Sequence, residues 1–185
     1  MKKLKVLIAW LAFLSLAQVA PAQTTLVFFP ARANEPPAST PATPLSRVNI
    51  PILQFVDASD TCAEFGGFMP QQYAAGGVNV VIGWMAATAT AGAVSWDVAF
   101  KSVTDDADDL DTKAYAANNN VSATTASASG EVDYATIAFT DGADMDSVAA
   151  GEYFRLSVCR DGDGTTSTDS LTENAQFLFA VVEEP

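Results

Sequence analysis

The sequence contains no histidine, and this absence removes several classes of chemistry. Its 185 residues include 9 lysines and arginines, 22 aspartates and glutamates, and no histidine. Serine–histidine triads, histidine-ligated metal centres and histidine general bases are therefore excluded. Serines and threonines are plentiful, but no lysine follows a serine at the SxxK spacing, so no hydroxyl group has a sequence signature of activation.

Basic residues are scarce, which leaves a formal net charge of −13. Contacts with phosphate need clustered lysine and arginine side chains, so we expect no nucleic-acid partner. An excess of acidic groups is typical of a surface protein that works outside cells or in salty water, where screening limits self-repulsion.

Cysteine is limited to Cys62 and Cys159, and no CxxC motif is present. A redox role is therefore not expected. In a secreted chain, two cysteines often form a disulfide that closes a long loop. The alternative is that both are strand positions that never meet, and the sequence leaves the two possibilities open.

Long hydrophobic runs are also lacking beyond the start of the chain. Met1–Ala22 has a basic beginning, a short apolar run and small residues at Ala20–Ala22, which predicts a secretory signal. An uncleaved anchor and a misassigned start are the alternatives. The apolar run is too short for a stable membrane span, so we expect a secreted chain with no such span in its mature form.

Residues 23–47 read as an extended, proline-rich arm or linker. Six of the nine prolines lie between Pro30 and Pro51, where they disfavour helices and central strands. The run Leu26, Val27, Phe28 and Phe29 is apolar and β-prone. It could be part of a plain linker, or an assembly arm that adds a strand to a neighbouring subunit.

The stretch Gly76–Val103 has the clearest secondary-structure signal. Apolar residues occupy every second position from Val78 to Trp84 and again from Val94 to Phe100. This period is that of a β-strand with one buried face. Small residues lie between the two runs, so we predict a long hairpin with both tryptophans on its inner face.

The same reasoning predicts about eight strands in one domain, residues 48–185. They are Val48–Val56, Cys62–Met69, Val78–Ala86, Ala93–Val103, Asn120–Ala128, Glu131–Phe139, Glu152–Arg160 and Ala175–Glu183. Short strands with turn signals between them indicate an all-β fold, an antiparallel two-sheet sandwich of jelly-roll type. A change of phase within Glu131–Phe139 predicts a β-bulge there, whereas Phe177, Phe179 and Val181 alternate cleanly.

One loop has the alternating oxygen ligands of a calcium site: Asp161, Asp163, Thr165 and Asp169. Thr166 and Thr172 stand where an EF-hand loop has glycine and a bidentate glutamate. A plain Gly/Asp turn is the alternative. We therefore expect no cofactor, with calcium as the exception to be tested.

Two further hypotheses concern sugars. Glu131 or Asp133 near Trp84 and Trp96 could serve a glycosidase, but acidic residues are abundant by composition and nothing places two at working distance. Trp84, Trp96, Phe100 and Tyr134 could form an aromatic platform, but their inward phase predicts core positions.

Three segments resemble a group of small proteins in tailed-phage and prophage genomes. They are Ala31–Ser39 (ARANEPPAS), Phe68–Val103, and Ala150–Asp161 (AGEYFRLSVCRD), and the likeness runs from about Phe28 to Val182. The resemblance implies a jelly-roll sandwich on a virion surface, as a capsid decoration or fibre component. It implies no catalytic residues.

The sequence thus predicts a non-enzymatic structural subunit of an extracellular or virion-type assembly, a homo-oligomer or a partner of other structural subunits. The alternative is a secreted carbohydrate-binding or adhesion module, with or without a requirement for calcium, since jelly rolls often have this role. That alternative predicts an exposed aromatic platform or an ordered calcium ion.

Overall fold

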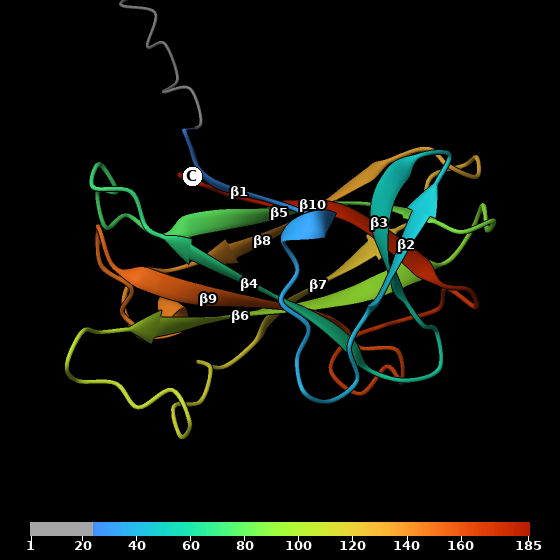
Figure 1. Cartoon of the computed structure of the whole chain (residues 1–185). Coiled ribbons are helices and arrows are strands. Elements are labelled where there is room, and N and C mark those ends of the chain that lie inside the picture. Colours follow the sequence, from blue (N-terminus) through green and yellow to red (C-terminus); the bar gives the residue numbers. More distant parts are fainter. Residues whose placement is uncertain (1–23) are drawn as a thin grey trace, which may run out of the picture.

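The computed structural model describes residues 24–185 of the chain (Figure 1). The predicted secretory signal, Met1–Ala22, lies outside the described residues. None of the described helices has the length and hydropathy that a membrane crossing requires.

Ten strands and two short 3-10 helices make up the described part of the chain. The strands are β1 (Thr25–Pro30), β2 (Thr43–Arg47), β3 (Ile50–Phe55), β4 (Thr61–Phe68), β5 (Val78–Ala86), β6 (Ala93–Val103), β7 (Asn119–Thr124), β8 (Asp133–Phe139), β9 (Tyr153–Arg160) and β10 (Ala175–Glu183). The 3-10 helices are η1 (Ala31–Ala33) and η2 (Ala143–Met145). The eight predicted strands correspond to β3 through β10.

The strands form two antiparallel sheets packed face to face (Figure 1). Sheet A has the order β2-β3-β10-β5-β8, with β1 also paired to β10, and sheet B has the order β4-β9-β6-β7. Counted from β3 as the first strand, the two sheets read 1-8-3-6 and 2-7-4-5. This is the jelly-roll arrangement, and the predicted fold class is confirmed.

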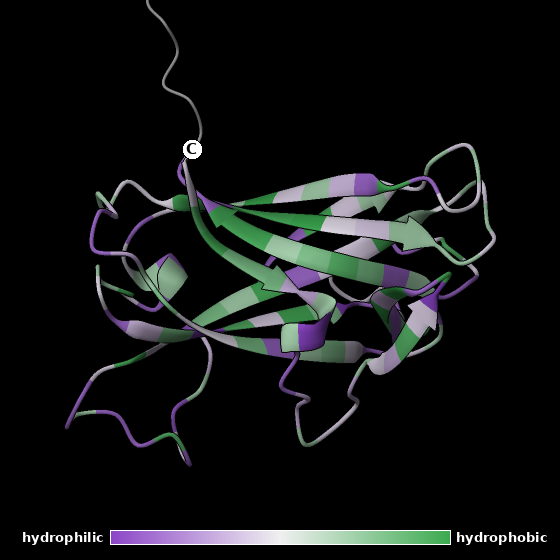
Figure 2. Cartoon of the chain, turned by 45° about the horizontal axis from the view of Figure 1, so that its top comes forward, coloured by the Kyte–Doolittle hydropathy of each residue, from purple (hydrophilic) through white to green (hydrophobic). Residues whose placement is uncertain are grey.

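Aromatic rings fill the space between the sheets. Trp84 of β5 and Trp96 of β6 meet across the core with ring centroids 6.0 Å apart, so both tryptophans face inward as predicted. The predicted hairpin is wrong, because β5 lies in sheet A and β6 in sheet B, and the small residues between them connect the two sheets. Phe55 packs edge-on against Trp96 at 5.1 Å. Figure 2 shows the hydrophobic residues concentrated along the strands, while hydrophilic residues gather in the loops.

The segment predicted as an arm is part of the sandwich. β1, which includes Leu26, Val27, Phe28 and Phe29, pairs antiparallel with β10 of the same chain, and β2 forms a hairpin with β3. Phe29 is buried against Phe65 and Phe154. The structure therefore places the start of the domain at β1 rather than at residue 48. The prolines misled the prediction because they are tolerated on edge strands such as these.

The β-bulge predicted in Glu131–Phe139 is absent from β8, and a bulge occurs in β10 instead. β8 pairs with β5 in unbroken register from Phe139 opposite Val78 to Asp133 opposite Trp84, so the bulge predicted in Glu131–Phe139 is wrong. The register of sheet A shifts instead within β10, between Phe177 and Phe179, and within β1, between Thr25 and Val27.

Candidate functional site

The four aromatic residues considered as a sugar platform divide between core and surface. Trp84, Trp96 and Phe100 are fully buried, as their phase predicts, and the two tryptophans line no open cleft. Tyr134 is 67% exposed, because the inward phase of β8 begins at Ala135. The expectation that Tyr134 belongs to the core is therefore wrong.

The bulge in β10 turns another aromatic side chain outward. Leu178 is the extra residue, since Phe177 lies opposite Trp84 and Phe179 lies opposite Gly83, the residue that precedes Trp84 in β5. One inserted residue reverses the phase of the strand beyond it. Phe177 therefore stays in the core, whereas Phe179 lies on the outer face of sheet A, and the clean alternation predicted for this strand is wrong.

Three aromatic side chains lie next to one another on the outer face of sheet A. We call them the aromatic strip: Phe28 on β1, Phe179 on β10 and Tyr134 on β8. The centroid of the Phe179 ring lies 5.6 Å from that of Phe28 and 6.1 Å from that of Tyr134. Phe28 is 55% exposed. Between β10 and β8, β5 contributes Gly83, where a Cβ atom would lie 2.4 Å from the Phe179 ring. Glycine lets the ring cross the sheet surface at this point.

The sheet surface around the strip is nearly free of negative charge. On β5, β8 and β10, the side chains that share this face with the strip include Asn79, Val81, Thr136, Gln176, Val181 and Glu183. Only the last of these is acidic, in a chain with 22 acidic residues. The face therefore combines apolar rings with amide and hydroxyl groups.

An apolar hollow of about 320 Å³ adjoins the strip at Phe179. It is lined by Pro30, Ala31, Arg32, Ile50, Pro51, Leu178 and Phe179. A second hollow, also of about 320 Å³, lies towards β2 and is lined in part by Leu45 and Ile52. Arg32 is on the wall of both hollows and is their only charged residue.

A second exposed aromatic pair lies on sheet B. Phe68 is 66% exposed and meets Tyr153 with ring centroids 5.2 Å apart. The hollow beside this pair is lined in part by Asp105 and Glu152. Its acidic surroundings distinguish it from the aromatic strip.

The fold separates one of the four residues predicted as calcium ligands, Asp169, from the other three. Asp163 and Thr165 stay near Asp161, whose carboxylate accepts the hydroxyl of Thr165. Asp169 instead accepts two hydrogen bonds of 2.8 Å from the buried guanidinium of Arg160. The predicted ligand set is therefore not assembled, because Asp169 neutralises an arginine elsewhere.

The loop's own donors occupy the carboxylate of Asp161. It accepts backbone N–H groups of Thr165, Thr166 and Ser167. Oxygens of Asp60, Asp161 and Asp163 lie within 4.8 Å of one another, but exposed acidic groups commonly gather without an ion. A plain Gly/Asp turn, the alternative left open by the sequence, accounts for these contacts.

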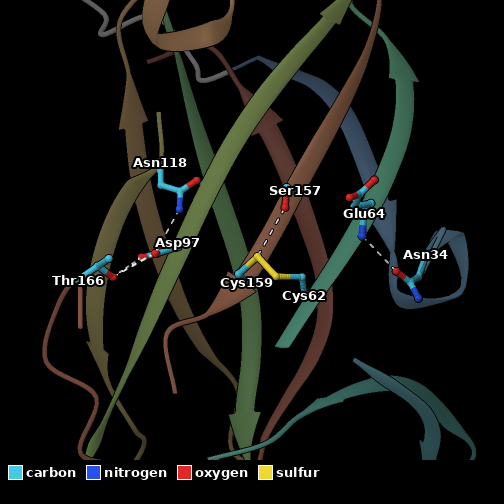
Figure 3. The surroundings of a disulfide bond; sticks show 8 residues. All are labelled: Asn34, Cys62, Glu64, Asp97, Asn118, Ser157, Cys159 and Thr166. Carbon is cyan, nitrogen blue, oxygen red and sulfur yellow. Dashed lines mark hydrogen bonds between the residues drawn. A yellow bond between two sulfur atoms is a disulfide. The ribbon is translucent and has the colours of Figure 1, made fainter. Parts of the chain in front are cut away.

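Asp97 of β6 and Asp161 share the hydroxyl group of Thr166, and Figure 3 shows its contact with Asp97. Thr166 Oγ1 lies 3.0 Å from an oxygen of Asp97 and 2.7 Å from one of Asp161, and Asn118 donates to Asp97 at 3.4 Å. Burial raises the pKa of Asp97, and the nearby Asp161 raises it further. Burial also acts to raise the pKa of Asp161, but hydrogen bonds from Ser167 and Thr166 outweigh it and hold that pKa well below its ordinary value.

The two cysteines are opposite each other on β4 and β9. Cys62 and Cys159 form a disulfide, which Figure 3 shows on the outer face of sheet B. The alternative that they never meet does not hold. The disulfide lies on the opposite sheet from the aromatic strip.

The residues proposed for a glycosidase do not form a catalytic pair. Asp133 accepts the backbone N–H of Ala126, and Glu131 lies exposed before β8 begins. With Trp84 and Trp96 fully buried, neither carboxyl group stands beside an open aromatic cleft.

Sequence reasoning missed three components of the aromatic face. Phe28 and Arg32 lay in the segment read as an arm, and Phe179 was assigned the inward phase. Gly83 was the available signal, since a glycine inside a strand often marks close approach of another group.

The sequence matches no protein-family model and no curated protein. Among solved structures, the fold is similar to that of TmCBM61, determined with β-1,4-galactotriose, at a TM-score of 0.33 and 12% identity over 71% of this chain and 69% of that one. It is also similar to TmCBM27, a carbohydrate-binding module studied for mannan recognition, at a TM-score of 0.38 and 8% identity over 89% of this chain and 86% of that one. Both similarities are distant, and neither identifies a ligand of this chain.

Proposed function

We propose that the protein is a non-catalytic module that binds a polysaccharide chain on the outer face of sheet A. The aromatic strip is the observation that supports this function. A sugar ring has apolar C–H faces that can cover an aromatic ring, and hydroxyl groups at its rim that need polar partners. The strip offers the rings, and Asn79, Thr136 and Gln176 offer amide and hydroxyl groups beside them.

The shape of the site favours an extended ligand over a compact one. The strip runs from β8 over β5 and β10 to β1 and lies on an open sheet surface, with Tyr134 and Phe179 in one pairing row and Phe28 two residues along the strand from that row. A small metabolite is usually held in a cavity that encloses most of its surface. A polymer can instead lie across such a face and contact several rings in succession.

The proposed setting is extracellular. The predicted signal at Met1–Ala22 and the disulfide between Cys62 and Cys159 both support it, because structural disulfides persist in oxidising compartments. An acidic surface outside the binding face would keep such a module soluble.

The test is affinity gel electrophoresis of the full chain on a panel of soluble polysaccharides, including galactan, mannan and acidic polymers. Retention should fall about tenfold or more in Phe179→Ala and Tyr134→Ala, because truncating a central aromatic side chain at an interface typically costs this much. Phe68→Ala is the matched control, since it removes an exposed ring from the other sheet.

Equal retention of wild type and both strip variants would refute the proposal, as would a loss confined to Phe68→Ala. Near-ultraviolet circular dichroism of each variant establishes that the fold is intact.

A second candidate is the subunit of an extracellular or virion-type assembly. The observation that favours it is the β2–β3 hairpin, where Leu45, Val48 and Ile50 are exposed, Val48 by 86%. Exposed apolar patches often mark contacts between proteins. Light scattering of wild type and Val48→Asp tests it: an oligomer that the substitution dissociates supports assembly, and a monomeric wild type removes it.

A further inference from the structure

We propose that Arg32 makes the sheet A site selective for acidic polysaccharides, those whose sugars bear carboxylate or sulfate groups. This inference rests on the proposed function and adds to it the chemical class of the ligand. Arg32 follows β1 directly, in η1, and lines the apolar hollow that adjoins the aromatic strip at Phe179. A sugar stacked on Phe179 would therefore have its neighbour within reach of a guanidinium group.

Arg32 differs from the other arginines in residues 24–185. Arg155 is paired with Glu64, and Arg160 with Asp169. Arg47 donates to Gln176 and to the carbonyl of Ala86. Of these described arginines, only Arg32 makes no ion pair and no side-chain hydrogen bond.

The surroundings of Arg32 leave its charge uncompensated. Neither of the two hollows that it lines includes an acidic residue. On the sheet face, Glu183 is opposite Thr25, at the far end of β1 from Arg32. A positive site of this kind, in a chain of net charge −13, is complementary to an anionic group on the ligand.

The geometry of the guanidinium suits the two anions in question. Its planar array of N–H donors can bind two oxygens of one carboxylate or sulfate group at once. The apolar wall of Pro30, Ile50 and Leu178 limits access of water on one side, which strengthens such a contact. The overall negative charge acts against a polyanion at long range, but physiological salt screens it beyond about 8 Å.

The experiment compares matched polymers by affinity gel electrophoresis at about 0.15 M salt. One pair is polygalacturonate and its methyl ester, which differ in the carboxylate. The other is a sulfated carrageenan and its desulfated form. Wild type should be retained about three- to tenfold more strongly by the acidic member of at least one pair, the range expected for one net hydrogen bond at a solvent-exposed site. The pair that shows the preference identifies the anion.

Two variants assign this preference to Arg32. Arg32→Gln should retain the acidic and neutral members equally, with retention by the neutral member unchanged. Arg32→Lys keeps the charge and should keep part of the preference. Phe179→Ala should instead weaken retention by both members, because it removes the stacking surface.

The outcomes separate this inference from the function on which it rests. Neutral members retained as strongly as acidic ones, or a preference that survives in Arg32→Gln, would overturn the selectivity and leave polysaccharide binding standing. Failure of Phe179→Ala to weaken retention would overturn the binding face itself.

Discussion

Arg160 is fully buried near one end of the sandwich and holds the loop that follows β9. Its guanidinium donates to the carboxylate of Asp169 and, at 2.6 Å each, to the carbonyls of Leu171 and Glu173. A buried charge is tolerated only where it is paired and hydrogen-bonded. This requirement, rather than metal binding, explains the position of Asp169.

We expect Asp169→Ala to lower the free energy of unfolding by about 3–5 kcal/mol, because it leaves the buried arginine without its counterion. Urea unfolding measures the loss. Asp163→Ala, an exposed acid of the same loop, should stay within about 0.5 kcal/mol of wild type. Equal losses in the two variants would show that the Arg160–Asp169 ion pair does not contribute to the free energy of unfolding.

Burial of the Asp97 carboxyl group, which raises its pKa, leads to a pH-dependent prediction. A raised pKa means that the folded state holds this proton more tightly than the unfolded chain, where the carboxyl has its ordinary value of 3.8. The stability that Asp97 contributes is therefore present at low pH and is lost as pH rises from that value through the folded pKa.

Asp97→Asn should consequently raise the melting temperature at pH 7, and the gain should shrink towards pH 3, where the wild-type carboxyl is protonated. The amide can donate to Thr166 and leave the threonine proton for Asp161. Thermal unfolding at both pH values checks this, and a variant less stable than wild type at pH 7 would contradict it.

At the scale of elements, β1 gives neighbouring residues opposite roles. Phe29 is buried against Phe65 and Phe154, whereas Phe28 lies on the outer face beside Phe179. The strand thus closes one edge of the core and completes the aromatic strip. Deleting β1 should therefore unfold the sandwich. If β1 were instead a free arm, the same deletion would leave a folded monomer.

Phe29→Ala should lower the free energy of unfolding by about 3–5 kcal/mol, the usual cost of emptying a buried phenylalanine site. Phe28→Ala should leave stability nearly unchanged but weaken retention by polysaccharide. Urea unfolding and affinity electrophoresis on both variants test this division. Similar stability losses in the two would contradict the assignment of Phe28 to the surface.

The disulfide links β4 to β9 across 97 residues of sequence. Closing a loop of this length restricts the unfolded chain, so the double variant Cys62→Ser, Cys159→Ser should be about 2–5 kcal/mol less stable. Because the cysteines lie on sheet B, polysaccharide retention of the folded variant should equal that of wild type. A folded variant that no longer binds polysaccharide would indicate that the ligand lies on sheet B, and would contradict the assignment to sheet A.

The sequence predicted the positions of the strands better than it predicted which side chains of each strand face the core. Alternation located β3 through β10 because each buries one side of a pleated strand. It failed where one residue changes the phase, as at Leu178, and where prolines on edge strands concealed β1 and β2. Those failures hid the candidate site, since Phe28, Arg32 and Phe179 all lie in the misassigned segments.

Over the whole molecule, charge and apolar surface are separated. Acidic residues gather in loops, including the run Asp105–Asp111 and the turn that begins at Asp161, while the outer face of sheet A is nearly uncharged. The loop 104–118 returns to β6, where the N–H of Ala116 donates to the carbonyl of Phe100. Sheet A therefore offers the less acidic face to a polymer.

The most direct test of this account is an NMR titration of the ¹⁵N-labelled full chain with an oligosaccharide of the best-retained polymer. Chemical-shift changes should centre on Phe28, Tyr134 and Phe179 and extend to Arg32, leaving Phe68 and Tyr153 unmoved. Chemical-shift changes confined to sheet B or to the loop at Asp161, with no change at the aromatic strip, would contradict the claim that the outer face of sheet A is the binding site.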